Sequence, residues 1–506
     1  MPDTPHENIN VCKAPQYKTI KGLCRLRDRL GGPALVEIKV PLKTITPVLG
    51  GATRPQKVDD EQEVDEVDGI RAPTVRGHLR FWWRALHGHQ YETSQKLYEA
   101  ESALWGRAAG RGIGGRSLVE IMITSKENKK IETYKLSKND FHCNSFYALW
   151  PARADELWRP GVCFTLSILC PQDREKTIKN VVRAWILFGG YGGRTRRGVG
   201  SLTVDGEPTD WLPDAKTHAN LRSALETLFE TDIFAPLPGK LPTDVPLLRG
   251  AELSVGEPSK SEPKAAWTTA IGWLKEFRQG APPQDTTSPE DWARQRGDNQ
   301  RPGRSNWPEA DKVRQNSLPR GGLPWAHGPK HSPVPAWPRG GFGLPILGQF
   351  QKENRNGVHW EKSLRPCTEP GNFQLQLAIN GEKCDRLASP LIVKALPLAN
   401  GEFLPCALWL NRAYPKNGEI VLVRNDKMTH PAPFDRLVAP KDTPHFKPLK
   451  NKASLKDAFM GWLIKPLKNK ASLKDAFMGW LIKPLKNKAS LKDAFMGCLK
   501  AWRVAP

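Results

Sequence analysis

The sequence has no long hydrophobic run and few cysteines among its 506 residues. No apolar segment approaches the roughly 20 residues that a helix needs to cross a bilayer, so membrane insertion is not expected. The first residues, MPDTPHENIN, lack the basic and apolar segments of a signal peptide. The nine cysteines are odd in number, scattered and without a C-x-x-C pair, which argues against a disulfide framework or a zinc site. A reducing cytoplasm is therefore the expected location.

Acidic residues are scarce relative to basic ones. Asp and Glu number 53 against 76 Lys and Arg, which gives a formal net charge of +23. An excess of this size predicts a polyanionic partner. The signatures of several enzyme classes are missing, including the P-loop, G-x-S-x-G, H-E-x-x-H and the protein-kinase set. We therefore expect no cofactor and no metal site.

Hydrophobic periodicity in the first half predicts four strands and two helices. The expected strands lie near residues 36–42, 117–124, 162–170 and 200–205, and the expected helices lie near 74–88 and 173–188. The order strand, helix, strand, strand, helix, strand is the split βαβ arrangement of ferredoxin-like domains, which RNA recognition modules also use. Both helices cover one face of such a sheet, so the other face is free for a ligand.

The second half predicts a degenerate copy of the same domain. A helix is expected at 265–278, with strands at 373–379, 389–398, 403–410 and 419–423. Residues 280–345 are rich in Pro, Gly and Arg and are expected to form no single compact element. The predicted fold class is α+β with two fused ferredoxin-like domains, long insertions and a helical repeat tail. The predicted division is an arm at 1–33, domains at 34–210 and 211–430, and a basic repeat tail at 431–506.

The C-terminal region is an internal repeat with a period of 18 residues. KPLKNKASLKDAFMGWLI begins at Lys447, recurs at Lys465 and, with changes near its end, recurs at Lys483. Eighteen residues equal five helical turns, so each copy presents the same face if it is helical. One interpretation is a basic amphipathic tail for RNA or for a partner helix. The other is a terminal extension left by recent duplication, because chain ends accept insertions well.

The strongest functional signal is the loop FGGYGGRTRRGVG, residues 188–200, between a predicted helix and a predicted strand. Its glycines allow positive φ and a close approach of the backbone to a phosphate, while Arg194, Arg196 and Arg197 supply forked donors. The loop follows its helix and lacks G-K-[ST], so it is not a P-loop. We expect a flexible basic loop that binds a polyanion backbone; the alternative is a flexible basic loop without a ligand.

A second basic feature lies on the helix predicted at 74–88. Arg76, Arg80 and Arg84 recur every four residues and share one face, beside an apolar seam that anchors the helix. Like charges at this spacing repel one another unless they are neutralised. RNA phosphates could neutralise them, and so could the acidic run at 59–68, which we interpret as a solvated loop.

The clustered imidazoles are those of His78, His87 and His89. A metal-independent ribonuclease needs one general acid and one general base beside the scissile phosphate. His78 and His87 lie on opposite sides of the predicted helix, and His89 lies beyond its end. We therefore expect no catalytic residues.

The loop, the segment IRAPTVRGHLRFWWRALHG and three later runs follow one another along the chain. The later runs are RSNWPEADKVRQ (304–315), GFGLPI (341–346) and RLASPLIVKALPLANGEFLP (386–405). Together these segments resemble the RAMP superfamily of CRISPR proteins, and within it the family of first subunits of the type III-B Cmr effector complex. The loop marks only the superfamily, whereas R-x-x-W-P-E and R-L-A-S-P-L make the narrower resemblance specific.

This resemblance implies two fused ferredoxin-like domains that bind CRISPR RNA and target RNA near the 3′ end of the guide, beside other Cmr subunits, in antiviral defence. It implies a non-catalytic binding and assembly role, because target cleavage and nucleotide cyclisation belong to other subunits of such complexes. The family motif positions carried over to this chain are Arg71, Arg76, Arg80, Trp83 and Arg84 on the helix and Gly192, Gly193, Arg194, Arg196, Arg197 and Gly198 in the loop.

Two alternatives stay open. The chain could be a metal-independent RAMP endoribonuclease that processes CRISPR repeat RNA, with His78 or His89 as the general acid or base. It could also be a basic scaffold that contacts only protein partners.

Overall fold

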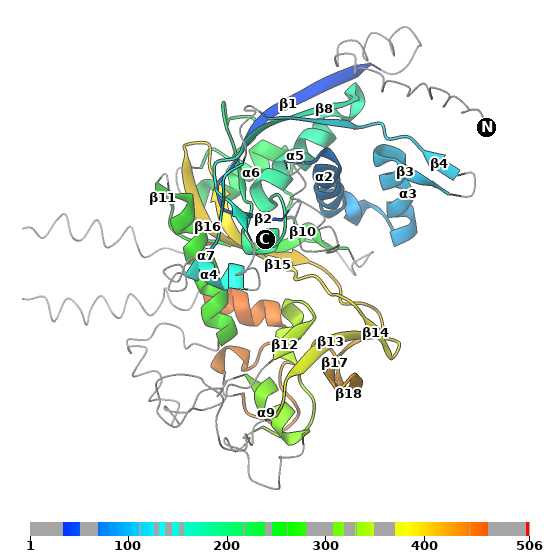
Figure 1. Ribbon diagram of the computed structural model, residues 1–506, viewed down its shortest axis with the longest axis vertical. Helices are drawn as coiled ribbons and strands as arrows, with labels where there is room; N and C mark the ends of the chain where they lie inside the picture. Colours follow the sequence, from blue (N-terminus) through cyan, green and yellow to red (C-terminus); the bar gives the residue numbers. More distant parts are fainter. Residues whose placement is uncertain are drawn as a thin grey trace, which may run out of the picture.

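The chain is an α+β protein with antiparallel sheets (Figure 1). The computed structural model describes residues 34–50, 69–110, 113–125, 131–136, 144–150, 156–215, 218–237, 245–260, 262–279, 307–317, 329, 331–348, 370–444, 446–463 and 502–504. The predicted arm at 1–33 and the acidic run at 59–68 lie outside the described residues. No described helix is both long enough and apolar enough to span a membrane.

Four antiparallel strands form the first sheet, in the order β5-β8-β1-β9. These strands and the two helices between them are β1 (Leu35–Thr44), α2 (Ala72–His87), β5 (Glu120–Ser125), β8 (Cys163–Pro171), α5 (Glu175–Phe188) and β9 (Leu202–Val204). The strand β1 is central, since it pairs with β8 along almost its whole length and with β9 at its end. The order of elements is the one predicted from the periodicity of the first half.

The second sheet is built around β16 (Glu402–Asn411). Its other members and the helix that covers it are β10 (Leu247–Val255), β11 (Ser259–Lys260), α7 (Pro263–Gln279), β15 (Leu391–Pro397) and β19 (Trp502–Val504). β16 pairs with β15, β10 and β11, and β19 pairs with β10, all antiparallel. The predicted helix at 265–278 and the predicted strands at 389–398 and 403–410 are therefore found within a few residues.

A third sheet lies below the other two in Figure 1. It contains β12 (Ile346–Gly348), β13 (Phe373–Ile379), β14 (Glu382–Cys384), β17 (Gly418–Arg424) and β18 (Lys427–Ala432), with α9 (Pro308–Gln315) and the 3₁₀ turn η7 (Pro338–Phe342) nearby. The predicted strands at 373–379 and 419–423 thus belong to a separate sheet. α9 and η7 fall inside the stretch 280–345, as two short separate elements rather than one compact element.

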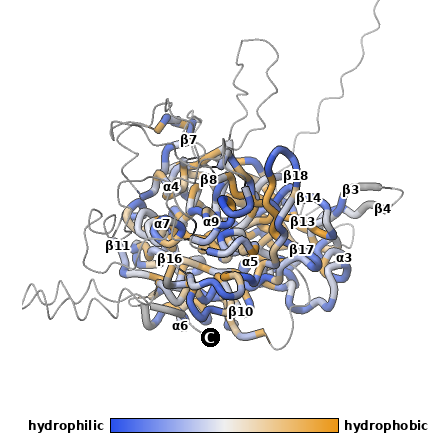
Figure 2. The backbone as a smooth tube through the Cα atoms, turned by 90° about the horizontal axis from the view of Figure 1, so that it is seen from below, coloured by the Kyte–Doolittle hydropathy of each residue, from blue (hydrophilic) through white to orange (hydrophobic). Residues whose placement is uncertain are grey.

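Shorter elements connect the sheets. The helical ones are η1 (Gly88–Gln90), α3 (Ser94–Trp105), α4 (Asn144–Leu149), η4 (Gln172–Arg174), η5 (Thr195–Arg197), α6 (His218–Phe229) and η8 (Lys447–Leu449). The strands are β2 (Val48–Leu49), β3 (Arg107–Gly110), β4 (Ile113–Gly115), β6 (Thr133–Tyr134) and β7 (Leu157–Trp158). The β3–β4 hairpin lies at the periphery in two perpendicular views (Figures 1 and 2).

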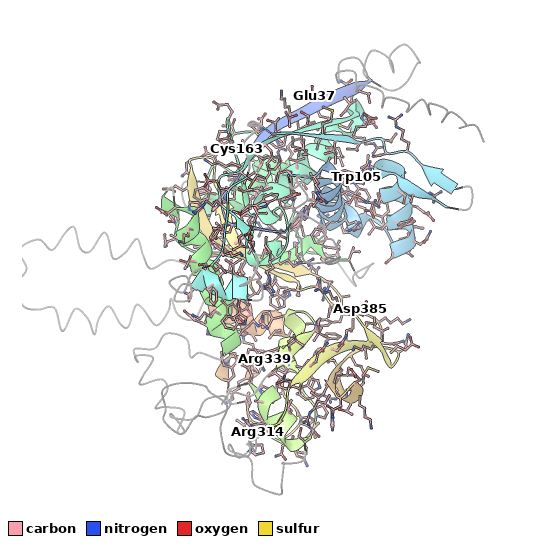
Figure 3. The ribbon with its side chains drawn as sticks, viewed as in Figure 1. Glu37, Trp105, Cys163, Arg314, Arg339 and Asp385 are labelled. Carbon is pink, nitrogen blue, oxygen red and sulfur yellow. The ribbon has the colours of Figure 1, made fainter. Side chains whose placement is uncertain are left out.

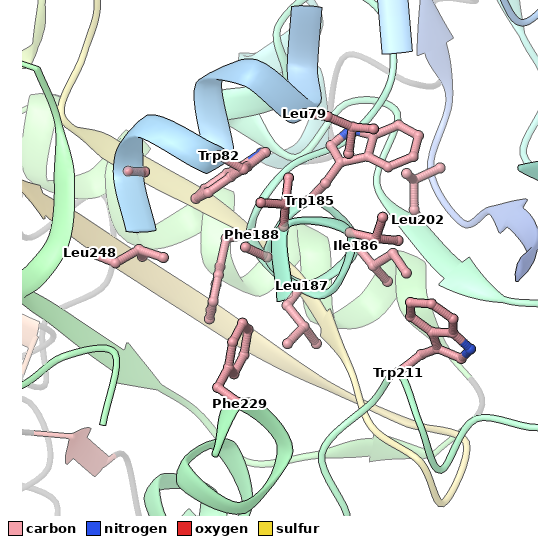
Figure 4. Packing of buried hydrophobic residues seen from close by; sticks show 14 of the residues in the cluster. Leu79, Trp82, Trp185, Ile186, Leu187, Phe188, Leu202, Trp211, Phe229 and Leu248 are labelled. Atoms are coloured by element: carbon pink, nitrogen blue, oxygen red, sulfur yellow. The ribbon is translucent and has the colours of Figure 1, made fainter. Parts of the chain in front are cut away.

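The helices α2 and α5 form the core of the first half. Apolar residues recur every three or four positions on both helices, so each helix buries one stripe. Trp82 and Phe188 bring the two stripes together, with ring centroids 6.0 Å apart. Figure 4 shows Phe188 between Trp82 and Phe229 of α6. Burying one side chain of this size contributes roughly 1.5–3 kcal/mol, so this cluster holds the C-terminal end of α5 against α2.

The R-x-x-W-P-E run is buried and structural where the structure describes it. Trp307 precedes α9, and Pro308 occupies the first turn, where its missing N–H costs no hydrogen bond. Glu309 is fully buried and accepts a hydrogen bond from the backbone N–H of Arg339 at 2.7 Å. Lys312 is fully buried and forms an ion pair with Asp442. Figure 3 labels Arg339 and Arg314 in this region.

The first copy of the 18-residue repeat packs into a core. Residues 455–463 form a helix, and Leu455, Phe459, Met460 and Trp462 are each at most 2 % exposed. They share a cluster with Phe277 of α7 and with other side chains of the second half. The interpretation of the repeat as a terminal extension is therefore wrong for its first copy.

Candidate nucleic-acid interface

The glycine and arginine loop joins α5 to β9 and lies against the second half of the chain. Gly198 has φ of +72°, and a Cβ there would lie 2.5 Å from the Trp267 ring of α7 and 2.9 Å from the Val393 carbonyl of β15. The glycine is therefore required twice, by its left-handed conformation and by the close packing of the two halves. Arg194 also has positive φ, at 60°, which few residues other than glycine adopt.

Hydrogen bonds hold the loop in place. Trp267 Nε1 donates to the Arg197 carbonyl at 2.7 Å, and Arg197 Nη1 donates to the Leu391 carbonyl of β15 at 3.0 Å. Arg194 Nη1 donates to the Ala148 carbonyl of α4 at 3.1 Å. Gly198, Val199 and Gly200 are buried. The structure thus differs from the predicted flexible loop, because neighbours from both halves of the chain hold these residues.

The loop arginines lie among other arginines. Burial, and after it Arg412, lowers the pKa of Arg196 to about 10. Burial lowers the pKa of Arg197 to about 9, with Arg278 as the next cause. For Arg194, burial again lowers the pKa first, followed by Arg278 and Arg386. Burial is the main cause of each shift, and the neighbouring arginines add a smaller repulsion that lowers the pKa further.

We call these six side chains the guanidinium cluster: Arg194, Arg196, Arg197, Arg278, Arg386 and Arg412. None of the three loop arginines forms an ion pair with a carboxylate of a described residue. Arg196 also lies over the Phe81 ring of α2, 5.3 Å from its centroid. The arrangement concentrates positive charge at the junction of the two halves, where an anion would relieve the repulsion.

The arginine stripe on α2 has a different partner from either predicted one. Arg80 Nε lies 2.7 Å from Glu101 Oε1 of α3, and Arg84 pairs with the same carboxylate oxygen. Glu101 is only 3 % exposed, whereas both arginine side chains keep about 30 % exposure. Arg76 donates to the Val119 carbonyl at 3.3 Å. Charge neutralisation by α3 was not predicted, because nothing in the local sequence pairs α2 with Glu101.

The N-terminus of α2 contacts the loop. The backbone N–H of Arg71 donates to the Tyr191 hydroxyl at 3.0 Å, and this hydroxyl donates to the Gly69 carbonyl at 3.3 Å. Tyr191 is itself fully buried. The structure thus brings the predicted residue Arg71 and the start of the loop together, although 120 residues separate them in the chain.

The loop also packs against the small strand β2. The backbone N–H of Gly193 donates to the Leu49 carbonyl at 2.6 Å. A Cβ on Gly192 would lie 2.8 Å from that carbonyl oxygen, and φ there is +88°. The motif glycines therefore let the backbone turn against β2, and the adjacent arginines lie half-buried at the junction between the halves.

The candidate histidines do not form an acid–base pair. His78 stacks on Trp185, and its ring lies edge-on to Tyr191, so its burial lowers its pKa to about 4. Burial lowers the pKa of His87 to about 4 as well. His89 Nε2 lies 3.2 Å from Arg249 Nη1. At neutral pH His78 and His87 are therefore uncharged, and a neutral imidazole can act as a general base but not as a general acid.

Lys394 is a site residue that the sequence analysis missed. It is fully buried on β15, and its Nζ donates to the carbonyls of Ile186 at 3.0 Å and Gly189 at 2.8 Å. These carbonyls end α5, so the lysine caps the helix immediately before the loop. The only available signal was its place in the RLASPLIVK run. No group of three or more potential metal ligands occurs among the described residues.

Replacing Lys394 with Met is expected to change the pH dependence of stability. Burial lowers the pKa of Lys394 from 10.5 to about 7. Between these pH values the Lys394 amine is protonated in the unfolded chain and neutral in the folded chain. The contribution of Lys394 to the free energy of unfolding therefore rises with pH. Urea unfolding at pH 7 and 9.5 should show a larger gain in the wild type than in K394M. Equal gains in both proteins would contradict a neutral buried amine.

A comparison with known protein families matches the part of the chain that contains α2 and the loop. Residues 41–203 match the RAMP superfamily. The curated CRISPR system Cmr subunit Cmr1-1 of Pyrococcus furiosus is 26 % identical to this chain over 159 residues, which cover 29 % of this chain and 44 % of that protein. The chain therefore aligns with less than half of the length of this relative.

Solved structures show a weaker likeness. The crystal structure of Cmr1 from Pyrococcus furiosus in its apo form matches with a TM-score of 0.38 and 17 % identity, covering 78 % of this chain and 93 % of that one. A chain of the type III-B Cmr-beta complex bound to cognate target RNA, solved by cryo-electron microscopy, matches with a TM-score of 0.36 and 11 % identity, covering 76 % and 96 %. TM-scores below 0.5 do not establish a shared fold.

Proposed function

We propose that this RAMP-like chain is a non-catalytic RNA-binding subunit of a type III-B CRISPR ribonucleoprotein. It would contact CRISPR RNA and target RNA near the 3′ end of the guide, beside other Cmr subunits. The observation that carries the proposal is the guanidinium cluster, whose loop arginines have no described carboxylate partner. The similarity of residues 41–203 to RAMP proteins supports the same assignment.

Two fused ferredoxin-like domains are part of the proposal. Numbered along the chain, the four main strands of the first sheet lie in the order second, third, first, fourth. The strands β15, β16, β10 and β19 repeat this order in the second sheet, and α7 and the helix 455–463 follow its first and third strands. Both sheets are thus consistent with the βαββαβ arrangement. The second domain would then extend past residue 430, with the third sheet inserted into it.

Binding in this proposal is mainly to the phosphate backbone. Guanidinium groups hold phosphates through paired, charge-assisted hydrogen bonds, and they carry no sequence information by that route. A guide must accept any sequence, so recognition by backbone and shape suits this role. The lowered pKa values of Arg196 and Arg197 stay above neutrality, so both groups remain charged under physiological conditions.

The proposal predicts salt-dependent binding without cleavage. The purified chain should bind single-stranded RNA in fluorescence anisotropy, and each phosphate contact should contribute about 0.7 to the slope of log K against log salt. CRISPR repeat RNA should stay intact during incubation. Specific cleavage that His78→Ala or His89→Ala abolishes would establish the endoribonuclease instead. Failure to retain RNA at low salt would favour the protein scaffold.

A further inference from the structure

The helix 455–463 fills a socket that is lined with aromatic side chains. Its Phe459 ring lies 5.1 Å from Phe277, 5.9 Å from Phe342 and 6.1 Å from Trp409, centroid to centroid. The Trp462 ring lies 5.4 Å from Phe277. We call Phe277, Phe342 and Trp409 the socket. Rings at these separations and angles attract one another beyond their buried area, so the helix is a substantial part of the core.

Polar contacts fix the register of this helix. The Ser454 hydroxyl accepts a hydrogen bond from the backbone N–H of Asp457 at 3.1 Å, which caps the helix start. Lys456 Nζ lies 2.7 Å from Glu252 Oε1 of β10. Every residue of the helix that makes these contacts belongs to the repeat.

The second copy carries the same residues at the same spacing. Leu473, Phe477, Met478 and Trp480 correspond in sequence to the buried residues of the first copy, and Ser472, Lys474 and Asp475 correspond to Ser454, Lys456 and Asp457. The third copy differs, because Cys498 stands at the position of Trp462. A helix formed by the second copy would thus offer the socket identical side chains, and the third copy would offer a poorer set.

We propose that the second copy, residues 465–482, is an alternative occupant of the socket, so that the chain exchanges between two registers. In this exchange the connection before the bound helix becomes 18 residues longer, and the connection after it becomes 18 residues shorter. Loop-closure free energy changes slowly with length, so lengthening one connection and shortening the other nearly cancel. Because the two copies have the same sequence, their helices would bind the socket equally well. The residues that flank each copy then determine which copy is bound.

Flanking residues favour the first copy. Phe446, directly before it, is 2 % exposed, and its ring lies 4.8 Å from Trp307 and 5.1 Å from Phe277. The residue directly before the second copy is Ile464, which cannot make ring contacts. The first copy is therefore the preferred occupant, and the second copy replaces it when the first is damaged.

The test is a set of substitutions made in a Phe495→Ala chain, which removes the third copy from the competition. In thermal unfolding, Phe459→Ala together with Phe477→Ala should lower Tm by about 10 °C, because no intact copy remains. Phe459→Ala alone should cost less than half of that loss, and Phe477→Ala alone should leave Tm unchanged. The expected non-additivity is the signature of one site with two occupants.

Two controls make the outcome decisive. Phe277→Ala damages the socket itself and should lower Tm whichever copy is bound. Deleting residues 465–482 should leave Tm unchanged by itself. In the chain that carries this deletion, Phe459→Ala should lower Tm as much as the double substitution does. If Phe459→Ala alone costs as much as the double substitution, the second copy does not enter the socket and the proposal fails.

Discussion

Replacing Arg194, Arg196 and Arg197 together by glutamine is expected to lower the affinity for single-stranded RNA at least about 100-fold, because each charge-assisted hydrogen bond to phosphate contributes about 1.5–3 kcal/mol. The remaining arginines of the guanidinium cluster keep some binding, so the loss is smaller than the sum of three contacts. The salt slope should fall by about 2, since three ion contacts are removed. Fluorescence anisotropy with a labelled RNA across a salt series measures both quantities.

The matched control removes three positive charges elsewhere. Lys96, Lys135 and Lys176 each have side chains more than half exposed and each pairs with a surface carboxylate. Changing all three to glutamine lowers the net charge by the same amount, and the affinity should change only slightly. Circular dichroism should show both triple variants folded. A similar loss of affinity in both would mean that overall charge, and not the cluster, binds RNA.

Much of the first half could be predicted because its signals are local. The alternation over 36–42 and 162–170 and the helical spacing around Trp82 and Trp185 each depend on a few neighbouring residues. The third sheet was not separable from the second, because β13 and β17 show the same strand pattern as β15 and β16. Which strands pair is a matter of long-range packing, which periodicity does not encode.

The candidate site was predicted only in part. The glycines and arginines of the loop stand out in the sequence, but the side chains that surround them come from α2, α7 and β15. Glu101 pairs with Arg84 over a sequence separation of 17 residues, and Lys394 reaches the end of α5 over 205 residues. A flexible loop was a reasonable expectation from six glycines, but Trp267 and Leu391 supply partners that a local pattern cannot show.

The near-identity of the three 18-residue copies suggested the wrong role for the first of them. Recent duplication of a segment suggests an extension with little structural role, and chain ends accept such segments. Yet the first copy buries Phe459 and Trp462 in the core of the second half. A duplicated segment can itself be an essential core helix, because duplication adds copies without displacing the original.

Gly198→Ala is expected to destabilise the chain and to weaken RNA binding together. The added Cβ meets the Trp267 ring at 2.5 Å and a backbone oxygen of β15 at 2.9 Å, both well inside normal contact, and φ of +72° adds strain. Overpacking typically costs about 1–3 kcal/mol, and a left-handed non-glycine residue costs about 1 kcal/mol more. The loop must then move away from the second half, which separates Arg197 from Arg278. Urea unfolding and RNA anisotropy measure the two effects.

Gly401→Ala is the control for this prediction, because it introduces backbone strain without a steric clash. Gly401 has φ of +79°, and a Cβ there meets nothing within 4 Å. It should therefore lose only about 1 kcal/mol and bind RNA normally. If G198A were no less stable than G401A, the halves would not be closely packed at the loop. If G198A lost stability but kept full affinity, the arginines would bind RNA without needing the junction between the two halves, and the site would have to be assigned to the first half alone.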